Sequence, residues 1–166
     1  MSDTLQQGPV RHKRGGLFYE DFTIGMMVEH RLRKTVTQMD NMLFCNMTLN
    51  PQPLHIDAHF CATETEWGRP LVNSLFTLGL MIGISVNDLT LGTTIANLGM
   101  TEVKFSSPLF EGDTLHAATE VLSKRLSRSR PDAGIVEFYH RAYQQEGKLV
   151  AECRRQAFMK CRTISV

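Results

Sequence analysis

Residues 71–86, LVNSLFTLGLMIGISV, decide the architecture of this chain. The stretch has no charged residue and is apolar almost all round, which predicts a helix that begins near Asn73 and is buried on every side. It is too short and too polar to span a membrane, because a spanning helix needs about 20 mostly apolar residues. The rest of the chain must therefore provide an apolar surface around this helix.

The sequence around this helix is rich in strand patterns. Residues 28–36, VEHRLRKTV, alternate in the way that a strand requires. After the helix, four long strands are predicted between turns rich in Gly, Pro and Asp, at residues 93–105, 114–125, 134–144 and 149–161. An α+β fold follows, in which a curved antiparallel sheet wraps around a buried central helix. This arrangement is the hotdog fold.

Length and charge exclude several classes of protein. The 166 residues suit one domain, which we expect at residues 17–166 behind a flexible arm at 1–16 that has no secretory apolar core. Lys and Arg total 18 against 17 Asp and Glu, a balance that argues against a nucleic-acid binder. The four cysteines form no CxxC pair, which argues against a zinc site or a disulfide scaffold. A reducing compartment, the cytoplasm, is the simplest expectation.

The segment between the early strand and the central helix carries its own punctuation. Thr37 followed by Asp40 predicts a capped helix that continues to Met47. The sequence NPQP at residues 50–53 breaks this helix, because proline disfavours helical backbone in the residue before it. A short helix is then expected from His55 or Ile56 through Glu66, before a turn at GRP, residues 68–70.

The most informative stretch for function is TLNPQPLHID, residues 48–57. It resembles the motif Asp-x-Asn-Pro-Leu-His-x-Asp of the MaoC-like hydratase/dehydratase family, which includes the (R)-specific enoyl-CoA hydratases. Asn50 stands in the place of the family's catalytic Asp, and Gln52 in the place of its Asn. The other motif positions match at Pro53, Leu54, His55 and Asp57.

Three further segments extend the resemblance over about residues 17–160. FSSPLFEGDTL at 105–115 is similar to the family's Phe-x-x-Pro-x-x-x-Gly-Asp-Thr-Leu, and TQMD at 37–40 to its capped helix start. KRLSRSRP at 124–131 looks like a segment of the branch that acts on branched or dicarboxylic acyl-CoA. The resemblance implies a homodimer with sites near the subunit interface. It also implies an acyl-CoA substrate, with no cofactor or metal beyond the coenzyme A of the substrate itself.

Hydration of a 2-enoyl thioester requires a base for the water and a site that stabilises an enolate-like oxygen. His55 suits the first role because imidazole titrates near neutrality, whereas Asn50 has no usable proton affinity and can only orient water or substrate. The alternatives are a structural histidine after a proline turn and a simple turn residue at position 50. Asp57 suits the first turn of a helix better than catalysis.

Substrate contacts are expected at the start of the central helix and from arginines. The family usually has His-Gly where this chain has Asn73 and Ser74, so the resemblance points to the Ser74 backbone N–H as the donor to the thioester oxygen, although Asn73 or Ser74 could be only a helix cap. Arg69 could bind a substrate carboxylate. The basic run could bind coenzyme A phosphates or be a solvated loop; it comprises Lys124, Arg125, Arg128 and Arg130.

The leading hypothesis is a hydro-lyase that interconverts 2-enoyl-CoA and 3-hydroxyacyl-CoA, with a mesaconyl, itaconyl or methylmalyl type of substrate preferred. A hotdog thioesterase is a second hypothesis, but it would normally need an acidic residue in the helix, and residues 71–86 have none. A non-catalytic acyl-CoA-binding module is a third, which the replacement of the family's Asp by Asn50 favours.

Overall fold

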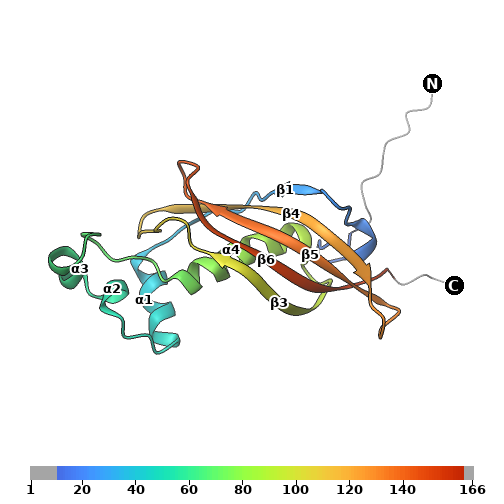
Figure 1. Ribbon diagram of the computed structural model, residues 1–166, viewed down its shortest axis with the longest axis horizontal. Coiled ribbons are helices and arrows are strands. Elements are labelled where there is room, and N and C mark those ends of the chain that lie inside the picture. The colour runs from blue at the N-terminus through green and yellow to red at the C-terminus, as the bar shows by residue number, and fades with distance from the viewer. Residues whose placement is uncertain (1–10, 163–166) are drawn as a thin grey trace, which may run out of the picture.

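The computed structural model describes residues 11–162. Its centre is an antiparallel sheet with the order β1-β4-β5-β6-β3, in which the short β2 also pairs with β4. Figure 1 shows this sheet curving over the long helix α4 (Ser74–Leu89). The predicted α+β fold, an antiparallel sheet around a central helix, is confirmed. The four long strands are β3 (Thr94–Lys104), β4 (Thr114–Leu126), β5 (Ala133–Tyr143) and β6 (Leu149–Lys160).

One face of the sheet is mostly apolar because buried and more exposed side chains alternate along most of β4, β5 and β6. In β5 and β6, every second side chain is buried beneath α4, including Phe138 and Met159. These side chains form two clusters, one around Met81 of α4 and the other around Leu89 at its end. Each buried large apolar side chain contributes about 1.5–3 kcal/mol relative to an exposed one, so this face holds helix and sheet together.

The early strand is interrupted, which differs from the continuous strand predicted for residues 28–36. The structure has β1 (Met27–Glu29) and β2 (Lys34–Thr35), separated by a loop. Glu29 lies opposite Ala118 and Lys34 opposite Leu115, so five steps along one chain face three along the other. The two extra residues leave the ladder, and His30 turns inward to a buried position.

The helical segment begins as predicted and then divides. Thr37 and Asp40 form the capping box of α1 (Gln38–Met47), and hydrogen bonds from Thr37 lower the pKa of Asp40 to about 2. The single helix expected up to Glu66 is instead α2 (Pro53–Ile56) and α3 (Ala58–Glu64). Asp57 separates them, because its extended backbone ends α2 while its side chain caps α3 by accepting from the Phe60 N–H at 2.9 Å.

Helix α4 differs from expectation in two ways. It continues to Leu89, beyond the predicted end near Val86, and so includes Asp88. It is also not buried on every side, since the sheet covers one face while Leu75 remains 63% exposed and Gly79 and Gly83 have open space around them. No helix within residues 11–162 combines the length and apolar character that crossing a membrane requires.

The chain just before the domain is bound to it. Residues 11–16 were expected to belong to a flexible arm, but the Gly16 N–H donates to the Leu91 carbonyl at 3.1 Å and the Arg11 side chain donates to the Asp88 carbonyl at 2.9 Å. A side chain at Gly16 would collide with the backbone of Leu91, so the close approach depends on glycine. Residues 1–10 of the expected arm lie outside the described part of the chain.

Candidate active site

A cavity of about 540 Å³ lies where α2, the start of α4 and the loop between β3 and β4 meet. This is the end of the molecule at which α1, α2 and α3 extend past the sheet (Figure 1). The cavity brings together the two motifs at residues 48–57 and 105–115 that carry the family resemblance. Residues 52–55 form one wall and residues 105–109 another. Its lining is Gln52, Leu54, His55, Trp67, Leu71, Val72, Ser74, Thr77, Phe105, Ser106, Ser107, Pro108, Leu109 and Val150.

The β3–β4 wall is held by its glycine–aspartate turn. The Asp113 carboxylate accepts the Phe110 N–H at 2.9 Å, while Gly112 adopts φ +93° and donates to the Val36 carbonyl at 2.8 Å. Beside this turn, the Val72 N–H donates to the Leu109 carbonyl at 2.9 Å. The motif residues at 112–113 therefore fix the wall against the chain that enters α4.

His55 lines the cavity in a defined tautomer. Its Nδ1 lies 2.9 Å from the carbonyl oxygen of Leu71, and a carbonyl can only accept, so Nδ1 carries the proton of the neutral ring. Nε2 is then the unprotonated nitrogen. The α2 turn fixes the backbone, because the His55 N–H donates to the Gln52 carbonyl at 3.0 Å. A half-buried histidine with a free basic nitrogen beside a cavity can accept a proton from water or substrate.

Ser74 and Asn73 occupy different positions at the start of α4. Asn73 is the N-cap, and its side-chain oxygen accepts the Leu75 N–H at 2.9 Å. Ser74 is the first helical residue and lines the cavity together with His55. Among the residues the structure describes, no acceptor pairs with the Ser74 N–H, which lies at the positive end of the helix. Capping by Asn73 and an available N–H at Ser74 are thus both present.

Asn50 and Gln52 differ from the expected arrangement of the motif. The Asn50 side-chain oxygen accepts the Gln52 N–H at 3.0 Å, which makes Asn50 a turn residue, and its side chain does not line the cavity. Gln52, to which the sequence analysis gave no role, does line it. Its position in the motif was the available signal. The orienting role assigned to Asn50 stays a prediction.

Arg69 lies beside the cavity and not in its wall. The guanidinium carbon stacks 4.0 Å from the ring centroid of Phe110, whose ring also lies 6.3 Å from that of Trp67. Trp67 itself lines the cavity. In this arrangement Arg69 supports an aromatic wall, and no arginine or lysine of residues 11–162 lines the cavity.

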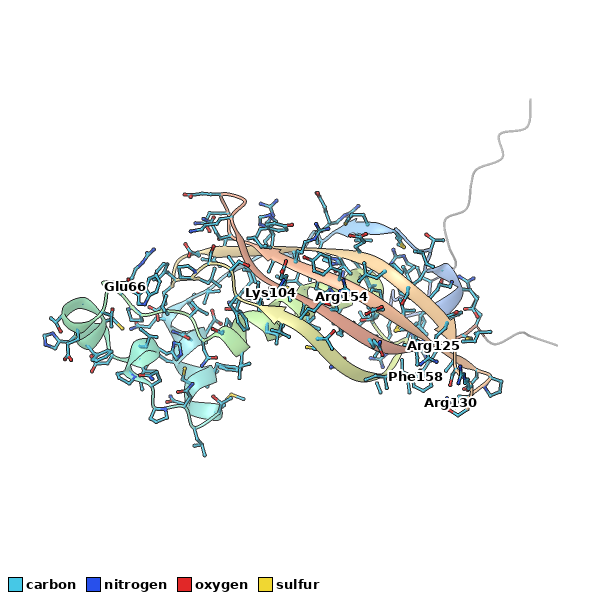
Figure 2. All side chains as sticks on the ribbon, viewed as in Figure 1. Glu66, Lys104, Arg125, Arg130, Arg154 and Phe158 are labelled. Atoms are coloured by element: carbon cyan, nitrogen blue, oxygen red, sulfur yellow. The ribbon has the colours of Figure 1, made fainter. Side chains whose placement is uncertain are left out.

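The basic run lies at the opposite end of the molecule. Figure 2 shows Arg125 and Arg130 far from Glu66, which follows α3. Arg130 lines a larger cavity of about 710 Å³ at this end and forms an ion pair with Asp132 at 2.7 Å. Lys124 donates to the backbone carbonyl of Phe22 at 2.6 Å and so is structural. Within one chain, the structure therefore separates Arg130 from His55.

Asn41 is the residue of this region that the sequence analysis missed. It is fully buried on α1 and contacts three segments around the cavity, including the entrance to α4. A polar residue four positions before Cys45, on the buried face of a capped helix, was the only signal. Among residues 11–162, no three His, Cys, Asp or Glu side chains come together as metal ligands.

The chain is similar in sequence to two named enzymes. The chain is 28% identical to the mesaconyl-CoA hydratase of Cereibacter sphaeroides and 27% identical to the beta-methylmalyl-CoA dehydratase of Chloroflexus aurantiacus. Each alignment covers 89% of this chain but only 42% and 41% of the relative, so the chain spans less than half the length of these two proteins.

Solved structures resemble the whole domain. The MaoC-like dehydratase from Rhodospirillum rubrum is 27% identical, with a TM-score of 0.77. The match covers 90% of this chain and 100% of that one. A Mycobacterium tuberculosis protein with a double hotdog fold is 22% identical with a TM-score of 0.81, over 91% of this chain and 46% of the other, which supports the predicted hotdog fold. The profile described as MaoC like domain matches residues 21–139, more than half of the chain. The chain belongs to the MaoC-like domain family.

Proposed function

We propose that this protein is an acyl-CoA hydratase/dehydratase that adds water to a 2-enoyl-CoA or removes it from a 3-hydroxyacyl-CoA. The observation that carries the proposal is the pairing of His55 with the start of α4. One cavity is lined by a histidine whose Nδ1 is fixed on Leu71 and by Ser74, whose N–H has no acceptor in the described part of the chain. Two relatives that each align with 89% of the chain are named as a mesaconyl-CoA hydratase and a beta-methylmalyl-CoA dehydratase, which supports the same reaction class.

The two groups divide the reaction between them. His55 Nε2 takes a proton from water as the oxygen forms a bond to C3 of the enoyl thioester. The electron pair of the C2–C3 double bond moves toward the thioester oxygen, where the Ser74 N–H stabilises the developing negative charge. The protonated His55 then gives its proton to C2, and the base is restored. Water addition moves no electrons to or from an acceptor, so we propose that coenzyme A of the substrate is the only cofactor involved.

For the acyl group we propose a small branched or dicarboxylic chain, as in the substrates for which the two relatives are named. The cavity offers neutral polar groups, including Gln52, Ser106 and Ser107. Such groups can donate hydrogen bonds to a second substrate carboxylate, and position 50, two residues before Gln52, carries the neutral Asn50 and no charged Asp. Arg69 could reach it only by leaving the ring of Phe110.

We further propose a homodimer. Strand β3 has an unpaired edge in the described chain, and the outer face of α4 exposes Leu75, Gly79 and Gly83. A second copy would cover both. It could also bring the partner's basic run toward the cavity, which a single chain does not do.

A cytoplasmic location is proposed from the cysteines, since Cys45, Cys61, Cys153 and Cys161 are all unpaired thiols.

Loss of the conjugated absorbance of an enoyl-CoA tests the reaction directly. We expect steady hydration of mesaconyl-CoA and slower hydration of crotonyl-CoA. Release of free thiol from either substrate would favour the thioesterase, and tight binding without turnover would favour the acyl-CoA-binding module. The structure already weakens the thioesterase hypothesis, because Asp88 is the only acidic residue of α4 and is paired with His30 at 3.0 Å. It lies about 21 Å along the helix from Ser74.

A further inference from the structure

The amide of Asn41 joins three segments that form the candidate active site. Its Nδ2 donates to the carbonyl of His55 and to that of Leu71, each at 3.0 Å. Its Oδ1 accepts the Asn73 N–H at 2.9 Å. Both amide protons and the amide oxygen are therefore used, and the side chain has no exposed surface.

These three hydrogen bonds act on the reacting groups through their neighbours. The Leu71 carbonyl that accepts from Asn41 also accepts from His55 Nδ1 at 2.9 Å, so one oxygen receives both donors. The Asn73 N–H that Asn41 accepts belongs to the N-cap that precedes Ser74. Asn41 thus contacts the backbone of the histidine, the acceptor that fixes its ring, and the cap of the helix that offers the oxyanion donor.

The position of Asn41 is itself fixed from outside the site. The capping box of Thr37 and Asp40 sets the start of α1 immediately before it. One turn later, the Cys45 carbonyl accepts the Asn50 N–H at 2.9 Å, and Asn73 Nδ2 lies 3.8 Å from the Cys45 sulfur. The buried face of α1 therefore serves as a rigid support to which the histidine turn and the start of α4 are both attached.

We propose that Asn41 is a positioning residue, which sets the tautomer of His55 and the distance between its Nε2 and the Ser74 N–H. This inference rests on the proposed hydratase function. It assigns Asn41 no contact with substrate. The physical reason is that base and oxyanion donor come from separate segments, and only a group with two donors and one acceptor in a fixed geometry satisfies all three attachment points.

Asn41→Asp is the test variant, because it keeps the shape of the side chain and removes donors. A carboxyl group can still accept from Asn73, but it donates at most one hydrogen bond, and only when protonated. We expect kcat for enoyl-CoA hydration to fall about 10–100-fold with KM changed much less, as follows from misplacing a catalytic group by a fraction of an ångström to an ångström. We also expect ¹⁵N NMR to show that His55 no longer carries its proton only on Nδ1.

Two controls separate positioning from loss of stability. Asn46→Asp makes the same chemical change at an exposed position of α1, and Thr119→Val destabilises a buried network remote from the cavity. Both should leave kcat and the His55 signal unchanged. If Thr119→Val lowers kcat as much as Asn41→Asp does, the positioning role is overturned.

The NMR measurement also separates this inference from the proposed function. If the wild-type protein hydrates no acyl-CoA, the proposed function fails, while the His55 tautomer in the variant still decides the role of Asn41. An unchanged tautomer in Asn41→Asp overturns the inference, and so does a changed tautomer with kcat within twofold of wild type. Should Asn41→Asp fail to fold, the wild-type protein supplies the test. Slow solvent exchange of the Asn41 amide protons and an Nδ1-protonated His55 are expected, and fast exchange or an Nε2-protonated ring would overturn the inference.

Discussion

The two ends of α4 both carry buried polar networks, yet only one of them is suited to chemistry. At the first end, which we call the open end, the Asn41 side chain binds backbone groups and His55 connects this network to the cavity. At the other end, which we call the closed end, side chains alone form a series of hydrogen bonds. Their order is Asp88, His30, Thr119 and His140. Asp88 reaches the surface with 22% of its side chain exposed, whereas His140 has no exposed surface.

The two histidines show what this difference means. His55 and His140 each use Nδ1 in a hydrogen bond, at 2.9 and 2.8 Å. What separates them is Nε2, since that of His55 belongs to a cavity-lining ring and that of His140 is buried without a partner in the described chain. A histidine can act as a base only where water or substrate reaches its second nitrogen. The surroundings of Nε2 therefore distinguish a reactive histidine from a structural one.

Replacing His55 by Ala should give the largest effect, and this effect should be on catalysis at the open end and not on stability. Loss of a positioned acid/base typically lowers the rate by about 10²–10⁴-fold. We expect kcat of enoyl-CoA hydration to fall in this range while the urea midpoint stays near that of wild type. His59→Ala, an exposed histidine on α3, is the matched control and should retain full activity. Turnover within a few-fold of wild type in the His55 variant would remove this residue from the mechanism.

Replacing Thr119 by Val should have the opposite consequence at the closed end. The hydroxyl is 2.8 Å from His30 Nε2 and 2.8 Å from His140 Nδ1, so the substitution leaves both ring nitrogens without their partner. Since each unsatisfied buried group costs about 1–3 kcal/mol, we expect the free energy of unfolding to fall by about 2–6 kcal/mol without a change in kcat. Thr101→Val, at an exposed position of β3, should be nearly neutral. A neutral Thr119→Val would show that the hydroxyl does not stabilise the fold.

The closed end should also set the response of stability to pH. Burial, with Arg155 and His30 adding to it, lowers the pKa of His140 well below 6.5. The folded ring therefore stays neutral, while the unfolded chain binds a proton as the pH falls below about 6.5. Because the unfolded state then holds more protons, the free energy of unfolding should be level above this pH and decrease below it.

Urea titrations between pH 5 and pH 8 measure this slope, which is at most ~1.4 kcal/mol per pH unit for each proton. Burial and Arg33 also lower the pKa of His116, so this histidine contributes in the same direction. His140→Leu should remove its own share of the slope and leave that of His116. An identical slope in wild type and variant would rule out His140 as the source.

The sequence predicted much of the fold and part of the site, for reasons that the comparison makes clear. The periodic strands, the capping box at Thr37 and the apolar run of α4 are local signals, and local signals predict elements. The division at Asp57 was not foreseen, because a carboxylate suits the first turn of a helix and its N-cap alike. The burial of Asn41 depends on three partners 14 to 32 residues away, and no local pattern encodes such contacts.

The same reasoning explains the arginines. Arg130 was a candidate for substrate binding because its run is basic, but proximity to His55 is a property of the tertiary fold. Arg69 is close to the cavity, as its position before the helix predicted, yet its guanidinium stacks on Phe110. The substrate-binding roles of Arg69 and Arg130 stay predictions. For Arg130 the role requires a second chain, whose basic run would have to reach the cavity of the first.

Asn50→Asp tests how the open end tolerates charge and should give the smallest effect. A carboxylate can accept the Gln52 N–H as the amide oxygen does, so the turn and the fold should persist. Half-exposure at this position lets water stabilise the new charge, which would not hold beside His140.

Substrate choice should nevertheless shift. The added charge repels the second carboxylate of a dicarboxylic enoyl-CoA and leaves a neutral chain unaffected. For partly solvated charges this repulsion is roughly 1 kcal/mol, or about fivefold in relative kcat/KM. We therefore expect kcat/KM for mesaconyl-CoA to fall relative to crotonyl-CoA, with Asn46→Asp as the control for net charge. Equal losses on both substrates would show that Asn50 positions the turn but does not help to select a dicarboxylic substrate.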